Sequence, residues 1–117
     1  MQIVVHALNH ADVPDVARLR VERAVRKLGP RLRRASDATV RFTAHGPRCR
    51  VEVELRAPRV PPLVAVGEGW RFEDAAREAT ERLDKHVERT RSQRERRIRR
   101  AARDTARGLP FPPAAEA

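Results

Sequence analysis

The stretch ATVRFTAHGPRCRVEVELR, residues 38–56, contains two runs of alternating apolar and polar residues separated by a turn sequence. The apolar members of these two runs are Ala38, Val40 and Phe42, then Cys49, Val51, Val53 and Leu55. His45-Gly46-Pro47 lies between them, as expected of a turn. Because successive side chains of a strand point to opposite faces, the pattern predicts an antiparallel hairpin with one solvated face.

The residues before this hairpin predict one strand and one helix. Residues 2–8 are apolar and rich in valine without clean alternation, which predicts a strand covered on both faces or buried between neighbours. Asp12 is the expected N-cap of the helix, with Pro14 in its first turn. Gly29-Pro30 should end or kink that helix. Apolar residues recur at helical spacing between these signals: Ala17, Val21, Ala24, Val25, Leu28 and Leu32.

The residues after the hairpin predict a short strand and a long helix. Three prolines at 58, 61 and 62 lead into a strand at 63–66 that ends at Gly67 and Gly69. From Phe72 onward a narrow apolar stripe recurs: Ala75, Ala76, Ala79, Leu83 and Val87. The resulting order is β-α-β-β-β-α. It predicts an α+β fold with a four-stranded sheet and two helices packed on one face, similar to a double-stranded RNA-binding domain.

The charge of the chain is concentrated near its C-terminal end. The 117 residues carry a formal net charge of +10, and residues 89–107 alone hold nine arginines against Glu95 and Asp104. Such a balance favours a polyanionic partner: RNA, DNA or an anionic membrane surface. We expect three segments: a domain at 1–91, a basic helical extension at 92–107, and a proline-rich disordered tail or linker stub at 108–117. The outer part of the extension is expected to be frayed, or ordered only on RNA.

The sequence contains no recognisable catalytic or metal-binding pattern. One cysteine excludes an intrachain disulfide and suits a reducing cytoplasm, and Cys49 alternates with valines as a core residue would. Glu52 and Glu54 are flanked by Arg50 and Arg56, so charge pairing is expected there instead of acid/base chemistry. We therefore expect no enzyme, cofactor, metal or small-molecule substrate. The N-terminal residues do not resemble a secretion signal, and no run is long enough to span a membrane.

Basic residues on the two predicted helices are the candidate binding site. Arg82, Lys85, Arg89 and Arg96 recur at spacings that place them on one face of the last helix, beside the apolar edge. The set is completed by Arg91 on that helix and by Arg23, Arg26 and Lys27 on the first helix. The basic residues of the first helix should extend the binding surface of the last helix into one patch. Arginine can grip phosphate oxygens bidentately, so recognition would follow RNA shape more than base sequence. Trp70 is expected in the core, with stacking on a nucleotide as the alternative.

Three stretches resemble the ribosome hibernation promoting factor family, which includes the ribosome-associated inhibitor also called protein Y and the sigma-54 modulation proteins. In VGEGWRFEDAAREATERLDKHVERTR, residues 66–91, the resemblance rests on Glu68-Gly69, Ala75, Arg82-Leu83 and His86-Val87. The weaker stretches are VRKL at 25–28 and the opening Met1-Gln2-Ile3. The resemblance covers roughly residues 1–91. The chain departs from the family pattern in lacking a glycine soon after the first strand, and at Arg71 and Ala24, where aspartate and lysine are usual.

The resemblance implies a protein that lodges in the decoding region of the small ribosomal subunit, over 16S-type ribosomal RNA. There it would block messenger and transfer RNA and hold the ribosome idle during starvation or stationary phase. It also implies a short form, or the N-terminal domain of a longer member that pairs two ribosomes. Two other functions stay open from the residues alone: a general module for structured RNA, and a basic domain that docks on an acidic partner. A membrane surface is disfavoured because residues 88–100 are apolar only at Ile98.

Overall fold

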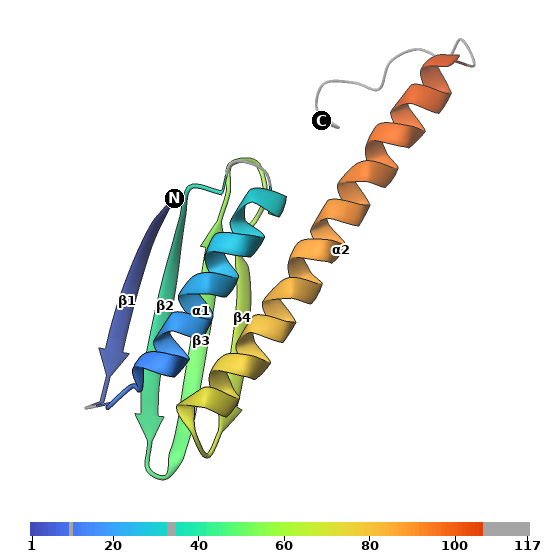
Figure 1. Ribbon diagram of the computed structural model, residues 1–117. Helices are drawn as coiled ribbons and strands as arrows, with labels where there is room; N and C mark the ends of the chain where they lie inside the picture. Colours follow the sequence, from blue (N-terminus) through green and yellow to red (C-terminus); the bar gives the residue numbers. More distant parts are fainter. Residues whose placement is uncertain (10, 33–34, 107–117) are drawn as a thin grey trace.

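The computed structural model describes residues 1–9, 11–32 and 35–106, and it confirms the order β-α-β-β-β-α (Figure 1). Arg107, the predicted tail at 108–117 and His10 lie outside the described residues. The elements are β1 (Gln2–Leu8), α1 (Asp15–Leu28), a short 3₁₀ helix η1 (Gly29–Leu32), β2 (Asp37–His45), β3 (Arg48–Arg56), β4 (Leu63–Gly69) and α2 (Phe72–Ala106).

The four strands form one sheet in the order β1-β2-β3-β4. The predicted hairpin is confirmed: β2 and β3 pair antiparallel, with Val40 opposite Val53, and Gly46 takes the positive φ of 55° that its turn requires. β4 pairs antiparallel with β3, whereas β1 pairs parallel with β2 because α1 carries the chain back across the sheet.

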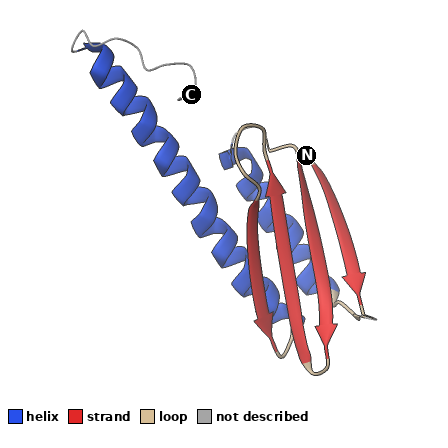
Figure 2. Cartoon of the chain, turned by 180° about the vertical axis from the view of Figure 1, so that it is seen from behind, coloured by secondary structure: helices blue, strands red, loops and turns tan. Residues whose placement is uncertain are grey.

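Both helices cover the same face of the sheet, as predicted (Figure 2). The core between the layers contains the inward residues of β2 and β3, the apolar stripes of α1 and α2, and an edge-to-face contact of Phe42 with Phe72 at 5.9 Å between ring centroids. α2 lies very close to β4. A Cβ atom built on Gly67 would stand 2.1 Å from the carbonyl oxygen of Ala75, so only glycine fits at that position.

Three local predictions are wrong: those for β1 and Trp70 because of tertiary position, and that for the start of α1 because of local backbone geometry. β1 is an edge strand whose side chains are exposed or only half-buried, and it is not covered by neighbours on both sides. α1 begins at Asp15 with Pro14 at the N-cap position, not at Asp12, because the extended backbone of Pro14 (φ −60°, ψ 143°) delays the first helical residue. Trp70 is 67% exposed, so it is not a core residue.

α2 extends far beyond the sheet (Figure 1). Its last buried residue is Val87, yet the helix continues to Ala106, roughly 28 Å further at the usual rise per residue. The expected fraying of the outer part is therefore not found in the described residues. Good helix formers, mainly arginine with alanine and glutamate, support this helix without tertiary contacts.

Candidate nucleic-acid interface

The α2 stripe is a row of basic side chains along one face of this helix. At 3.6 residues per turn its members fall within about 60° of one another. Sequence reasoning found the first part of the row but missed its last two members, which the same spacing rule would have included. We define the α2 stripe as Lys85, Arg89, Arg96, Arg100 and Arg103.

The side chains of the α2 stripe are exposed and form no ion pair with any described residue. The helix positions between them on this face hold Ser92 and Gln93, which are uncharged. A shallow hollow here is lined by Lys85, Glu88, Arg89, Ser92, Gln93 and Arg96. Like charges three or four residues apart on a helix repel each other. A polyanion lying along the stripe would relieve that repulsion, since each arginine can bind phosphate oxygens.

Arg82 was predicted to belong to this row, and its position on the helix agrees, but its guanidinium is engaged within the fold. Arg82 Nη1 donates a hydrogen bond to the carbonyl oxygen of Val66 at 2.6 Å, and Arg82 also pairs with Glu78 at 3.1 Å. Glu78 in turn accepts a hydrogen bond from the backbone N–H of Glu68 at 3.4 Å. Arg82 therefore helps to close the outer edge of β4.

Arg91 lies on the opposite side of α2 from the stripe, because nine residues from Arg82 amount to half a turn beyond two full turns. Its guanidinium pairs with Glu95 at 3.4 Å. The structure therefore does not bring Arg91 together with the other predicted residues.

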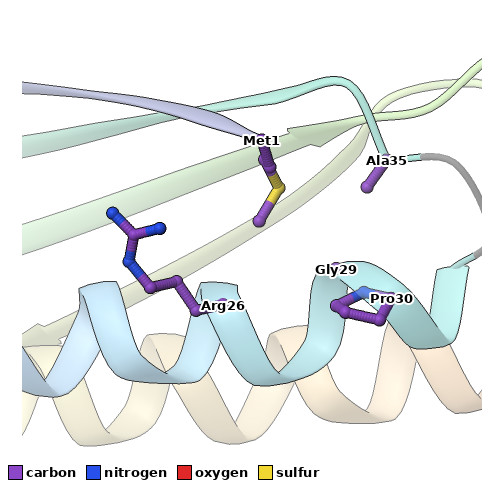
Figure 3. Close-up of a pocket in the computed structure, with 5 residues that line it drawn as sticks. All are labelled: Met1, Arg26, Gly29, Pro30 and Ala35. Carbon is purple, nitrogen blue, oxygen red and sulfur yellow. The ribbon is translucent and has the colours of Figure 1, made fainter.

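The three predicted residues of α1 are exposed, but they spread around the outer side of that helix. Arg26 extends on the side of α1 nearest Met1 and lines a hollow with Met1, Gly29, Pro30 and Ala35 (Figure 3). Lys27 lies about 100° further around the helix, and Arg23 lies between them. Arg23 and Lys27 can thus contribute to a binding surface on the helical layer, whereas Arg26 faces toward the β1 side.

An acidic ridge separates α1 from the α2 stripe, so the expected single patch does not form. Asp84 and Glu88 lie on the side of α2 nearest η1, where Arg31 pairs with them at 3.5 Å and 2.6 Å. Arg82 marks the other side of α2, nearest β4. The stripe lies on this β4 side, and Arg23 and Lys27 lie beyond the ridge, so the basic residues form two strips.

The sheet face opposite the helices carries an alternating ladder of ion pairs. Its order is Asp37, Arg56, Glu54, Arg41, Glu52 and Arg50, with successive N···O distances between 2.7 and 3.9 Å. The hydrogen bond from Arg56, and next that from Ser36, hold the pKa of Asp37 below its usual 3.8. Three acids and three arginines neutralise one another, which confirms the charge pairing predicted for Glu52 and Glu54. This face therefore offers an anionic partner little net charge.

Trp70 and Cys49 lie together at the end of β4. The Arg48 guanidinium stands over the Trp70 ring at 5.0 Å from its centroid, and the Cys49 thiol donates a weak hydrogen bond to the Trp70 carbonyl at 3.8 Å. Burial chiefly, and the charge of Glu73 next, raise the pKa of the Cys49 thiol, which disfavours the reactive thiolate. Cys49 is half-buried and packs against the core, which is close to the predicted core position.

Within the described part of the chain, no cluster of three or more histidine, cysteine or acidic side chains has a geometry that could hold a metal ion. No helix there is both long enough and apolar enough to cross a membrane. The fold and the α2 stripe thus define a class: a small basic α+β domain whose long second helix presents cations that have no ion-pair partner among the described residues.

Comparison with known proteins assigns the family within this class. The family model described as "Sigma 54 modulation protein / S30EA ribosomal protein" matches residues 4–100, so the chain belongs to this family of ribosome-associated proteins. The match confirms the resemblance drawn from the sequence and reaches into the α2 extension, past residue 91. No curated protein sequence matches the chain.

Two solved structures share the fold. A ribosomal subunit interface protein from Coxiella burnetii superposes with a TM-score of 0.68 at 14% identity, over 79% of this chain and 99% of that one. The N-terminal domain of Thermus thermophilus Protein Y superposes with a TM-score of 0.62 at 23% identity, over 76% of this chain and 98% of that one. At these identities the likeness supports the fold alone.

Proposed function

We propose that this protein is a hibernation factor that binds the small ribosomal subunit over 16S-type ribosomal RNA in the decoding region. In this position it blocks messenger and transfer RNA and holds the ribosome idle under stress, in the cytoplasm. Family membership supports association with the ribosome. The single observation that carries the RNA contact is the α2 stripe, five exposed cations without ion-pair partners among the described residues.

The geometry supports a division of roles among the segments of the chain. Residues 1–91 form the ribosome-binding domain, and the apolar stripe of α2 anchors the helix on the sheet as far as Val87. The extension at 92–107 lengthens the cationic row, and Arg23 and Lys27 supply the second strip. Phosphate contacts of this kind position a protein without reading bases, so selectivity would come from the shape of folded RNA. The proposed activity needs no cofactor and no small-molecule substrate.

Sucrose-gradient sedimentation tests this proposal. The wild-type protein, added to purified ribosomes at low salt, should migrate with the small subunit and with whole ribosomes. The variant Lys85→Glu/Arg89→Glu/Arg96→Glu should remain at the top of the gradient while its circular dichroism stays that of the wild type. Arg82 is left intact because it stabilises the β4 edge.

The matched control is Arg91→Glu/Arg94→Glu/Arg97→Glu, which makes the same change in charge on other sides of α2. It should retain most of the binding. Wild-type protein that stays at the top of a low-salt gradient would exclude the hibernation role. Equal binding to ribosomes and to an unrelated folded RNA would instead support a general RNA-binding module.

A further inference from the structure

The two edges of the sheet differ in how their free backbone groups are satisfied. At the β4 edge, the Val66 carbonyl and the Glu68 N–H are bonded by Arg82 and Glu78 of α2. At the β1 edge, nothing in the described part of the chain lies beyond the strand in either view (Figures 1 and 2). The β1 edge is therefore the more open of the two edges of the sheet.

The backbone groups that β1 presents outward can be identified from one hydrogen bond. The Gln2 N–H donates to the Ser36 carbonyl at 3.4 Å, so the groups of Gln2 point toward β2. Because the direction alternates along a strand, the groups of Ile3, Val5 and Ala7 point away from the sheet. These three residues present three N–H donors and three carbonyl acceptors without a partner among the described residues.

β1 lacks the features that usually protect an edge strand. Natural edges carry charged side chains, prolines or bulges that prevent pairing with another chain. The sequence of β1, QIVVHAL, has none of these charges and no proline, in a protein of which 36% of residues are charged. Val4 and Leu8 are also 37% and 42% exposed. Charge repulsion between copies of this +10 chain is thus low at β1.

We propose that the β1 edge pairs with the β1 edge of a second copy of this chain, antiparallel about a two-fold axis at Val5. In this register Val5 faces the partner's Val5, and Ile3 faces the partner's Ala7. Residues opposite each other in such hydrogen-bonded pairs exchange both of their bonds. The outward N–H and carbonyl groups of all three residues are then hydrogen-bonded on both strands, and the two sheets form one continuous sheet.

Charge distribution favours the antiparallel arrangement. The Met1 end of β1 lies beside Arg26, whereas the Leu8 end leads to Asp12, which is exposed and has no ion-pair partner among the described residues. An antiparallel pair places the basic end of each copy next to the acidic end of its partner. Each α2 begins over β4, at the far edge of the joined sheet, and then extends beyond the sheet, so the two α2 stripes are kept apart and remain free to bind RNA.

Sedimentation equilibrium of the nuclease-treated protein over a range of concentrations tests the pairing. The wild type should show a monomer–dimer equilibrium. On the open face of the joined sheet Val4 lies opposite the partner's His6, so Val4→Lys/His6→Lys should weaken dimerisation about tenfold by placing like charges opposite each other. Val4→Glu/His6→Lys should restore it, because each pair then has opposite charges. The control Val64→Lys/Ile98→Lys adds the same charge at exposed sites on β4 and α2, away from β1, and should leave dimerisation unchanged.

A wild-type protein that stays monomeric at every concentration overturns the proposal. So does a dimer that the control variant weakens as much as Val4→Lys/His6→Lys, or a dimer that Val4→Glu/His6→Lys fails to restore. Ribosome binding does not enter these measurements, so a failure of pairing leaves the proposed function untouched.

Discussion

Arg82 donates a 2.6 Å hydrogen bond to the carbonyl of Val66, which joins the first third of α2 to the outer edge of β4. Arg82 shares a helix face with the α2 stripe, yet its charge is used inside the fold. The stripe residues next to it, Lys85 and Arg89, have no such partner among the described residues. Substitution of Arg82 should therefore affect stability, whereas substitution of Lys85 or Arg89 should affect RNA binding.

Arg82→Gln should lower the free energy of unfolding by about 1 kcal/mol, because a charged hydrogen bond is lost at a half-exposed site. Lys85→Gln should leave that free energy unchanged and weaken RNA binding instead. Urea denaturation and RNA titration of both variants measure the two effects. A stability loss at Lys85 equal to that at Arg82 would contradict this separation.

The outer part of the α2 stripe should contribute directly to the salt dependence of RNA affinity. Arg96→Gln/Arg100→Gln/Arg103→Gln should reduce the slope of log affinity against log salt by about 2, since each lost phosphate contact on RNA contributes roughly 0.7 to 0.9. The matched triple Arg91→Gln/Arg94→Gln/Arg97→Gln removes the same charge from other sides of the helix and should change the slope by less than half as much. Equal slopes would mean that net charge, not the face, governs binding.

Gly67→Ala should destabilise the fold by about 3 kcal/mol or more, because its methyl group would meet the helix backbone at Ala75 and Ala79 and force α2 away from β4. Gly69→Ala is the control: its nearest contact would be the Cβ atom of Asp74 at 3.1 Å, which needs a shift of only a few tenths of an ångström. Thermal unfolding of the two variants gives the comparison. A similar melting temperature for both would show that α2 shifts freely.

Acid should remove the stability that Asp37 contributes at the end of the ion-pair ladder. Its pKa is lower in the folded state, so this contribution is complete above the unfolded-state pKa and is lost as the pH falls through the folded-state value. The melting temperature of the wild type should therefore fall between about pH 5 and pH 2, and that of Asp37→Asn should fall less. Asp15→Asn, which alters an exposed pair within α1, should follow the wild type.

Much of the fold could be predicted from the sequence because its signals are local. The alternation on either side of His45-Gly46-Pro47 defines the hairpin, and the spacing of Ala75, Ala79 and Leu83 defines the buried side of α2. These periods of two and 3.6 residues depend only on backbone geometry within one element. The same spacing predicted the basic row of α2, although its outer members, Arg100 and Arg103, were missed.

The remaining features depend on contacts between residues far apart in the chain, which no local period encodes. Strand order alone makes β1 an edge and leaves Ile3, Val5 and Ala7 facing outward. Because α2 lies close to β4, Arg82 hydrogen-bonds a free carbonyl at the edge of that strand. Asp84 and Glu88, which pair with Arg31, divide the basic residues into two strips. The sequence by itself determined which residues are charged and which helix face they share. Only the tertiary structure decided which of those charges are neutralised by ion pairs within the fold and which remain free to bind a partner.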